Sequence, residues 1–117
     1  MSAVTTTVIG SARWPHPEPI SPERVISGQP MASTLVLDDE GSSQSGLWKV
    51  EPGEFTTKLI GYKEFIHVIS GQAKLVHDSG EVYSLGPGVV LALPEGWSGR
   101  WLIETTLVKS YTIVRST

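Results

Sequence analysis

Residues 72–93, QAKLVHDSGEVYSLGPGVVLAL, contain three short apolar runs separated by two turns, and this stretch decides the fold class. The turn Asp78-Ser79-Gly80 separates the first two runs, and its glycine can adopt a positive φ. Gly86-Pro87-Gly88 separates the second run from the third. Short runs rich in Val, Leu and Tyr between such turns predict consecutive β-hairpins. The stretch therefore indicates antiparallel strands at 72–77, 81–85 and 89–93.

The same pattern of short apolar runs and turns continues on both sides of this stretch. From Ser33 onward, short runs rich in β-branched, aromatic and leucine residues alternate with turn sequences such as EPGE at 51–54 and PEG at 94–96. No apolar stripe recurs at helical spacing over a useful length, so no helix is expected. The pattern predicts an all-β fold, a sandwich or barrel of antiparallel strands. Beyond the quoted stretch, we expect strands at 34–38, 45–50, 55–60, 63–69, 98–104 and 107–115.

Residues 1–30 differ in composition from the rest of the chain. Five of the eight prolines fall here, and proline interrupts helices and removes the N–H donors of a strand. We predict an extended N-terminal arm over 1–30, with one short strand at 5–9, followed by a single β-barrel domain over 31–117. The arm is expected to be either loosely attached or laid across a partner subunit, with Trp14 and Ile20 as apolar anchors.

The composition narrows the classes of function. A chain of 117 residues suits one domain, and its lack of cysteine excludes disulfides, thiolate zinc sites and iron–sulfur clusters. The net charge is −3 and the nine Lys and Arg residues are scattered, so nucleic acid is not an expected partner. No apolar run approaches the roughly 18–20 residues of a membrane-spanning helix, and the N-terminus lacks the order of a secretion signal. No membrane association is therefore expected, and by elimination we expect a cytoplasmic protein.

Two glycine-bounded patterns lie inside the β-rich region. Glu64 is preceded by Gly53 and followed after six residues by Gly71, and a second pattern contains Gly88 and Pro94-Glu95-Gly96. Over residues 46–114 these patterns resemble the two motifs of the cupin superfamily, and more narrowly its small single-domain members of the ureidoglycine aminohydrolase-like (DUF861) type. The resemblance implies a cupin-like double-stranded β-helix, that is, a jelly-roll barrel. Further residues that carry it are Gly46-Leu47-Trp48, Glu64-Phe65, Gly86-Pro87-Gly88, Trp97, Trp101, Lys109 and Tyr111.

Most of the metal-ligand positions that the resemblance implies hold other residues. The motifs supply histidines together with a glutamate, and here only Glu64 remains. Because one carboxylate cannot hold a transition metal tightly, no cofactor is expected, and a weakly bound divalent metal on Glu64 is the open alternative. The three histidines are not expected to restore the site, since His67 is predicted to face away from Glu64 and the others lie at a turn and in the arm. The three histidine positions of the motifs hold Leu59, Gly61 and Gly99, and the asparagine position of the second motif holds Ile103.

Strand alternation places Glu64 inside the predicted barrel. If Glu64 points inward, Tyr62 does so too, whereas the residues between and beside them point outward. A carboxylate among aromatic rings either has a raised pKa or pairs with a cation, and Lys109, expected near the rim, is the candidate cation. Trp97 is placed on the loop at the mouth of the cavity. The residues expected to bind a ligand around this carboxylate are Trp48, Tyr62, Trp97, Trp101 and Tyr111.

Each of these residues also has a purely structural interpretation. Glu64 can serve to bond the backbone or a nearby lysine or tyrosine. Trp48 and Trp101 can be core packing, because four tryptophans must be accommodated somewhere. Lys109 can be a solvated charge that protects an edge strand. His67 is expected at a subunit interface rather than in a chemical role.

The functional hypothesis is a small-molecule-binding cupin. In its enzymatic form, Glu64 and Lys109 are the candidate catalytic residues acting on a nitrogenous or carbohydrate-like metabolite without a tightly bound metal. Two alternatives stay open, a non-catalytic ligand-sensing or binding module and a structural homodimer without ligand. Apolar residues on both faces of several strands, as in Phe65-Ile66 and Val89-Val90-Leu91, call for a second covering layer. In so short a chain that layer can be another subunit, so a homodimer is expected.

Overall fold

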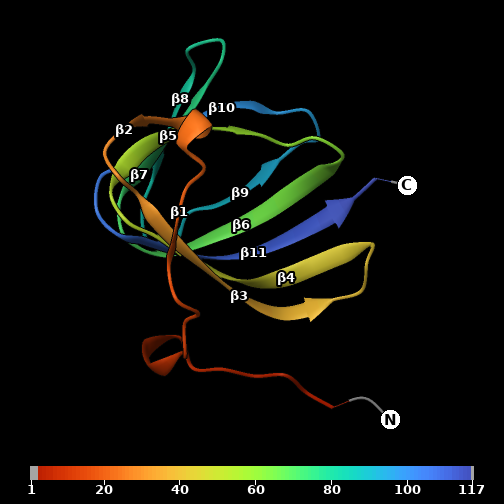
Figure 1. The fold of residues 1–117 in the computed structure, drawn as a ribbon. Coiled ribbons are helices and arrows are strands. Elements are labelled where there is room, and N and C mark those ends of the chain that lie inside the picture. Colours follow the sequence, from red (N-terminus) through yellow and green to blue (C-terminus); the bar gives the residue numbers. More distant parts are fainter. Residues whose placement is uncertain (1–2, 117) are drawn as a thin grey trace.

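The computed structural model describes residues 3–116 as two antiparallel sheets that face each other (Figure 1). One sheet has the strand order β1-β3-β4-β11-β6-β9 and the other the order β2-β5-β10-β7-β8. Two 3-10 turns, η1 (Ile9–Ser11) and η2 (Pro22–Arg24), lie near the start of the chain, and none of the described helices is long and apolar enough to cross a membrane. The strands are β1 (Glu18–Pro19), β2 (Val25–Ser27), β3 (Met31–Asp39), β4 (Ser43–Val50), β5 (Gly53–Lys58), β6 (Tyr62–Ser70), β7 (Ala73–His77), β8 (Val82–Leu85), β9 (Val90–Leu93), β10 (Ser98–Ile103) and β11 (Leu107–Arg115).

The all-β fold class predicted from the sequence is confirmed. All nine predicted strands of the β-rich region are present as β3 to β11, and their ends differ from the prediction by at most three residues. The hairpin of β7 and β8 closes as its turn sequence suggests: the N–H of Gly80 donates to the carbonyl of His77 at 2.8 Å, and Gly80 has a φ of 94°. Strand alternation and turn glycines were therefore sufficient to locate these elements.

The N-terminal thirty residues contain two strands that the sequence did not predict. β1 pairs with β3 at one edge of the six-stranded sheet, and β2 pairs with β5 in the other sheet. Ile20 is buried in the core, and its N–H donates to the carbonyl of Pro30 at 3.1 Å. Trp14 is the second contact of this segment, with the ammonium of Lys49 4.7 Å from its ring centre. The strand predicted at 5–9 is wrong: residues 3–8 have no regular structure, and η1 begins at Ile9.

The core lies between the two sheets and is built from the inward residues of alternating strands. Phe55, Leu75 and Leu107 are among the large side chains that are fully buried there. β11 is a central strand, with β4 on one side and β6 on the other. The inward residues of β11 therefore face the barrel interior with a neighbouring strand on each side, and none of them lies at a sheet edge.

Candidate functional site

Strands β6 and β11 bring a carboxylate and an amine together inside the barrel. Along β6, exposed Lys63, Phe65 and His67 alternate with more buried neighbours, so Glu64 faces inward as the strand period requires. Along β11 the odd-numbered residues from 107 to 111 are buried, and Lys109 is one of them. The two strands are direct neighbours in the sheet. The predicted inward orientation of Glu64 is therefore observed.

Lys109 and Glu64 form a buried ion pair. The Nζ atom of Lys109 donates to Oε2 of Glu64 at 2.6 Å, and the two side chains are 7% and 12% exposed. The ion pair considered from the sequence is thus present. The alternative of Lys109 as a solvated edge-strand charge is wrong, because β11 is central and the residue is buried rather than at the rim.

Two tryptophans complete the surroundings of the ammonium group. Nζ of Lys109 lies 4.5 Å from the ring centre of Trp48 on β4 and 5.1 Å from that of Trp101 on β10. The two indole rings are 5.9 Å apart at 47° to each other. A cation over an indole face is attracted by the ring quadrupole, and the attraction strengthens where water is excluded. Trp48 and Trp101 therefore pack against each other and also attract the positive charge of Lys109. Because β4 and β10 belong to different sheets, this contact joins the two sheets.

The pair changes the protonation equilibria around it. Burial lowers the pKa of Lys109, and this effect outweighs the opposing attraction and hydrogen bond from Glu64. Burial also raises the pKa of Tyr62 and of Tyr111, and the negative charge of Glu64 raises both further. Both phenols therefore stay protonated to a higher pH than ordinary tyrosines do.

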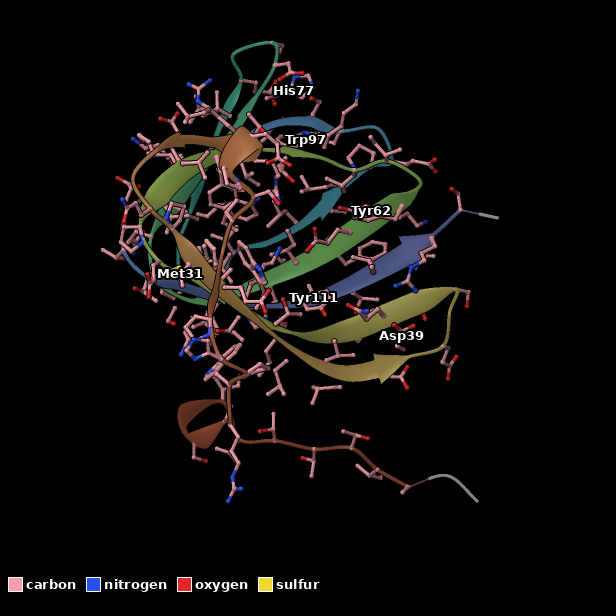
Figure 2. The ribbon with its side chains drawn as sticks, in the orientation of Figure 1. Met31, Asp39, Tyr62, His77, Trp97 and Tyr111 are labelled. Atoms are coloured by element: carbon pink, nitrogen blue, oxygen red, sulfur yellow. The ribbon has the colours of Figure 1, made fainter. Side chains whose placement is uncertain are left out.

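A cavity of about 220 Å³ opens above the ion pair. Tyr62 and Tyr111, labelled in Figure 2, lie on its wall together with Glu64 and Lys109. The phenol of Tyr111 donates to Oε1 of Gln44 at 2.7 Å, which fixes the orientation of both side chains. The full lining is Thr34, Gln44, Trp48, Tyr62, Glu64, Lys109, Tyr111 and Ile113.

Three lining residues were not among the candidates from the sequence. Gln44 and Trp48 are separated by an even number of residues on β4, and so are Ile113 and Lys109 on β11. Because such residues share a face of the strand, extending the alternation along both strands would have identified Gln44 and Ile113. Thr34 stands opposite Trp48 in the pairing of β3 with β4. That register depends on which strands are neighbours, and no local pattern in the sequence reveals it.

The structure separates Trp97 from the other candidates. Trp97 is buried and packs against His77, with ring centres 5.5 Å apart. It lines another hollow, of about 350 Å³, together with His77 and Tyr83. Trp101, by contrast, lies behind Lys109 and touches the cavity only through that contact. Of the seven residues proposed from the sequence, Trp48, Tyr62, Glu64, Lys109 and Tyr111 share the cavity.

The residues present do not fit a tightly bound metal. Leu59, at one histidine position implied by the cupin resemblance, is buried in the core, as is Ile103 at the asparagine position of the second motif. At another histidine position, a Cβ added to Gly99 would lie 2.6 Å from the ring of Trp97 and closer still to the carbonyl oxygen of Val76, so no histidine fits there without displacing its neighbours. Within residues 3–116, no three His, Cys, Asp or Glu side chains gather as a metal site would need. The surviving carboxylate already has Lys109 as its counter-ion.

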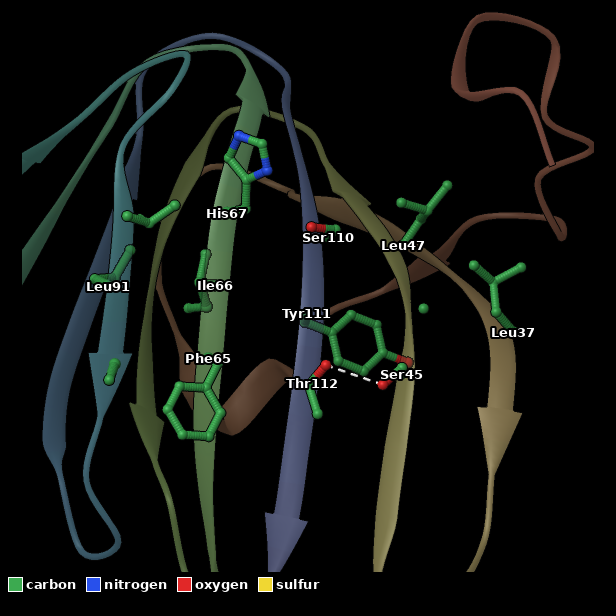
Figure 3. Close-up of a pocket in the computed structure, with 13 residues that line it drawn as sticks. Leu37, Ser45, Leu47, Phe65, Ile66, His67, Leu91, Ser110, Tyr111 and Thr112 are labelled. Carbon is green, nitrogen blue, oxygen red and sulfur yellow. Dashed lines mark hydrogen bonds between the residues drawn. The ribbon is translucent and has the colours of Figure 1, made fainter. Parts of the chain in front are cut away.

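The outer face of the same sheet carries an open groove of about 670 Å³, shown in Figure 3. Phe65 and His67 of β6 and Ser110 and Thr112 of β11 lie in it, and the hydroxyls of Ser45 and Thr112 are 2.9 Å apart. Of the lining residues within 3–116, none is Asp, Glu, Lys or Arg. Two of its apolar side chains are well exposed, Phe65 at 46% and Val90 at 70%.

Comparison with known proteins places the chain in a family. The family model described as the EutQ-like cupin domain matches residues 37–111. No curated protein matches the chain in sequence. Among solved structures, an ethanolamine utilization protein Q (EutQ) from Salmonella typhimurium LT2 is similar at 21% identity and a TM-score of 0.65, over 74% of this chain and 72% of that one.

Two further structures show the same fold at greater coverage. A DUF861 family protein from Pseudomonas syringae pv. tomato DC3000 has 21% identity and a TM-score of 0.77 over 89% of this chain, which spans 45% of that protein. The cupin domain of Schizosaccharomyces pombe Cnp3 has 10% identity and a TM-score of 0.71 over 95% of this chain and 74% of that one. At such identities the likeness establishes the architecture of the barrel.

Proposed function

The chain belongs to the family of EutQ-like cupin domains, and we propose from this premise that it binds a small polar metabolite in the barrel cavity. In this proposal the Glu64–Lys109 pair forms the floor of the binding site and acts as a proton donor and acceptor without a tightly bound metal. The observation that carries the proposal is the placement of a buried ion pair on the wall of a cavity of about 220 Å³.

A buried ion pair is a weak source of stability. Removing two charges from water costs several kcal/mol per ion, and well-packed apolar residues often stabilise a core as much or more. If Glu64 and Lys109 served folding alone, apolar side chains in their place would stabilise the barrel as well or better. Strained or costly groups of this kind gather where a protein binds or converts a ligand. The pair therefore favours a ligand-binding role over a purely structural one.

The cavity walls suit a compact molecule with several hydrogen-bonding groups. The Gln44 amide is already bonded by the Tyr111 phenol and donates to Asp39, so it offers a ligand its second N–H and its second oxygen lone pair. The oxygen of Tyr111 can accept a further hydrogen bond, the phenol of Tyr62 can donate or accept one, and the face of Trp48 can cover the flat side of a ligand. If one water takes roughly 30 Å³, the space of about 220 Å³ corresponds to about seven waters. A short nitrogenous or carbohydrate-like metabolite meets both conditions.

The same pair can move a proton. Glu64 and Lys109 are within hydrogen-bond distance at 2.6 Å, and burial lowers the pKa of Lys109 toward the range in which an amine can serve as a base. A ligand that displaces or shares this hydrogen bond would meet a carboxylate and an amine on one side of it. This arrangement supports acid–base chemistry on the bound molecule.

A thermal-shift screen tests the binding proposal. Ligands that bind the native state stabilise it, by about 2.7 kcal/mol at one hundred times the dissociation constant. Ureides, amino acids, sugars and short hydroxycarbonyl compounds are screened, and any hit is repeated on Gln44→Leu and on the outward control His67→Ala. We expect the thermal shift to be smaller in Gln44→Leu and unchanged in His67→Ala. Equal thermal shifts in the two variants would show that the ligand binds outside this cavity.

Turnover in Glu64→Gln separates an enzyme from a sensor. Glutamine keeps the shape and a hydrogen-bond acceptor for Lys109 but cannot exchange a proton at that oxygen. If the protein is an enzyme, conversion of the bound ligand is lost in Glu64→Gln, while the variant, although less stable because Lys109 has lost its counter-ion, still folds and still shows a thermal shift with the ligand. Turnover that persists in this variant would remove the acid–base role.

A second proposal concerns the outer groove, which we assign to a second copy of this chain. Among the described residues that line the groove there is no Asp, Glu, Lys or Arg, so two such faces can meet without desolvating paired charges. Phe65 and Val90 are exposed there and would be covered. Light scattering is expected to show a dimer at micromolar concentration, and a monomer would contradict the assignment.

A further inference from the structure

Lys109 is a primary amine whose position is fixed at the wall of a cavity. Its side chain is 7% exposed, its Nζ atom is held 2.6 Å from Glu64, and the ring centres of Trp48 and Trp101 lie 4.5 Å and 5.1 Å from the same atom. A lysine so confined has lost most of the rotamer freedom that a surface lysine keeps. Any molecule in the cavity therefore meets an amine that is already positioned.

We propose that Lys109 forms a reversible imine with a short hydroxy-aldehyde or hydroxy-ketone bound in the barrel cavity, with Glu64 as the proton carrier. The inference rests on the proposed function, because it requires a ligand in the same cavity. It goes further in naming the reacting atom, the bond that forms and the chemical class of the ligand.

The pair supplies the two forms of the amine that imine formation needs. Only the neutral amine is a nucleophile, and desolvation in an apolar pocket is one of the ways in which proteins activate a lysine. Burial lowers the pKa of Lys109. Glu64, at 2.6 Å, can take the proton that the ammonium must lose before it reacts.

Every atom and proton of the step is accounted for. Lys109 first gives one proton to Glu64, and its neutral nitrogen forms a bond to the carbonyl carbon while the C=O π pair moves to oxygen. A second nitrogen proton passes to that oxygen, which gives a hydroxyl group. Glu64 then returns its proton to this hydroxyl group, the lone pair of the nitrogen forms the C=N double bond, the C–O bond breaks, and water leaves with that bond pair. Ammonium and carbonyl thus become a protonated imine and one water, with no oxidant or reductant.

The charge of the site is the same before and after the reaction. The protonated imine carries one positive charge on the nitrogen that the ammonium carried, so it keeps Glu64 as its counter-ion. The faces of Trp48 and Trp101, 4.5 Å and 5.1 Å from that nitrogen, attract the new cation as they attracted the old one. Imine formation therefore adds no free-energy cost for a change in buried charge.

The cavity determines which carbonyl compounds fit. A volume of about 220 Å³ suits a chain of a few carbons, although the hollow opens to solvent. Hydroxyl groups on such a chain have the Gln44 amide and the phenols of Tyr62 and Tyr111 as partners. A long aliphatic aldehyde meets neither condition. Glycolaldehyde and dihydroxyacetone are the smallest members of the favoured class and serve as probes.

Reductive trapping with mass mapping tests the inference on the full chain. The protein is treated with each probe and cyanoborohydride at neutral pH, which converts an imine into a stable secondary amine, and is then digested with trypsin. A modified Lys109 is no longer cleaved, so a peptide of residues 101–115 appears with the mass of one probe less one oxygen atom added. Because the cavity raises the effective concentration of the carbonyl, Lys109 is expected to react on the order of tenfold faster than exposed Lys63, or more.

Two variants and one binding measurement distinguish the outcomes. Lys109→Arg keeps a cation but has no imine-forming amine, so the adduct on 101–115 disappears, whereas Lys63→Arg on the outer face leaves it unchanged. A thermal shift with the probe but no preferential adduct on Lys109 overturns the imine and leaves the binding proposal standing. No thermal shift and no adduct with any probe, together with no hit in the wider screen, overturns both.

Discussion

The two faces of β6 and β11 are built from alternate residues of the same strands and yet differ in chemistry. Inward lie Glu64, Lys109 and Tyr111, where charge is buried beside a small cavity. Outward lie Phe65 and Thr112 in a wider groove without carboxylates or lysines. A single strand thus presents charged side chains to the barrel interior and uncharged ones to the outer groove, because neighbouring side chains point to opposite sides of the sheet.

The difference also explains where substitutions should matter. Inside the barrel, a change disturbs charge pairing and close packing at once, since the interior has little room to relax. On the outer groove, side chains are partly solvated and a change costs little in folding.

Breaking the ion pair should have the largest effect. Lys109→Met leaves Glu64 buried without its cation, and removing one partner of a buried pair typically costs about 3–5 kcal/mol of unfolding free energy. Urea denaturation measures the loss. The double variant Glu64→Gln with Lys109→Met should recover a substantial part of it, because neither charge is then left unpaired.

The outward neighbour provides the control for this prediction. Lys63 is exposed on the same strand, and Lys63→Met should change the unfolding free energy by no more than about 0.5 kcal/mol. Equal losses in Lys109→Met and Lys63→Met, or a double variant no better than the single one, would show that the interior pair is not coupled.

Filling the space at Gly99 should have the next largest effect. An added methyl group would lie 2.6 Å from the ring of Trp97 and against the carbonyl of Val76, so Gly99→Ala should cost about 1–3 kcal/mol through overpacking. Thermal unfolding measures it. Gly10→Ala is the matched control, since nothing lies within 4 Å of the Cβ position there. A harmless Gly99→Ala would mean that a larger ligand side chain has room at this position after all.

A charge in the outer groove should change assembly rather than folding. Val90 is 70% exposed on the edge strand β9, so Val90→Lys should alter the stability of the monomer by less than about 0.5 kcal/mol. If two copies meet on this face, light scattering will show a smaller mass for the variant at the same concentration. A variant as dimeric as the parent chain would locate the dimer contact on another surface.

The smallest expected effect is in the alkaline titration. Tyr62 and Tyr111 have pKa values raised above the ordinary 10.0, so both bind protons more tightly in the folded chain than in the unfolded one. Their contribution to stability is complete below pH 10.0 and is lost as the pH rises through their folded pKa values. Absorbance of tyrosinate in Tyr83→Phe, in which only these two phenols remain, should show midpoints above those of the unfolded chain. Coinciding midpoints would refute a buried position beside Glu64.

Local patterns were enough to predict the inward set but not its surroundings. Alternation along β6 placed Glu64 and Tyr62 on the inner side, and the cupin resemblance pointed to Trp48 and Tyr111. The sequence could not show whether β11 is an edge or a central strand, because strand order depends on pairing between distant segments. Lys109 was for this reason expected near the rim, or as a solvated charge, and it is in fact buried.

Two other features depended on long-range contacts as well. β1 and β2 have two and three residues and lie among prolines, so no periodic signal marks them, and their pairing partners β3 and β5 define them. Trp97 was placed at the cavity mouth from its position on a loop. It fills the space over Gly99 and stacks on His77 instead, which only the packing of β10 against β7 determines.

The most direct test of the central claim is a crystal structure of the full chain grown with a ligand that raises its melting temperature. The account predicts electron density in the cavity bounded by Gln44, Tyr111 and Lys109, within hydrogen-bond distance of the Lys109 amine or joined to it. A ligand found only in the outer groove, with the interior filled by side chains and the Glu64–Lys109 contact unchanged, would contradict it.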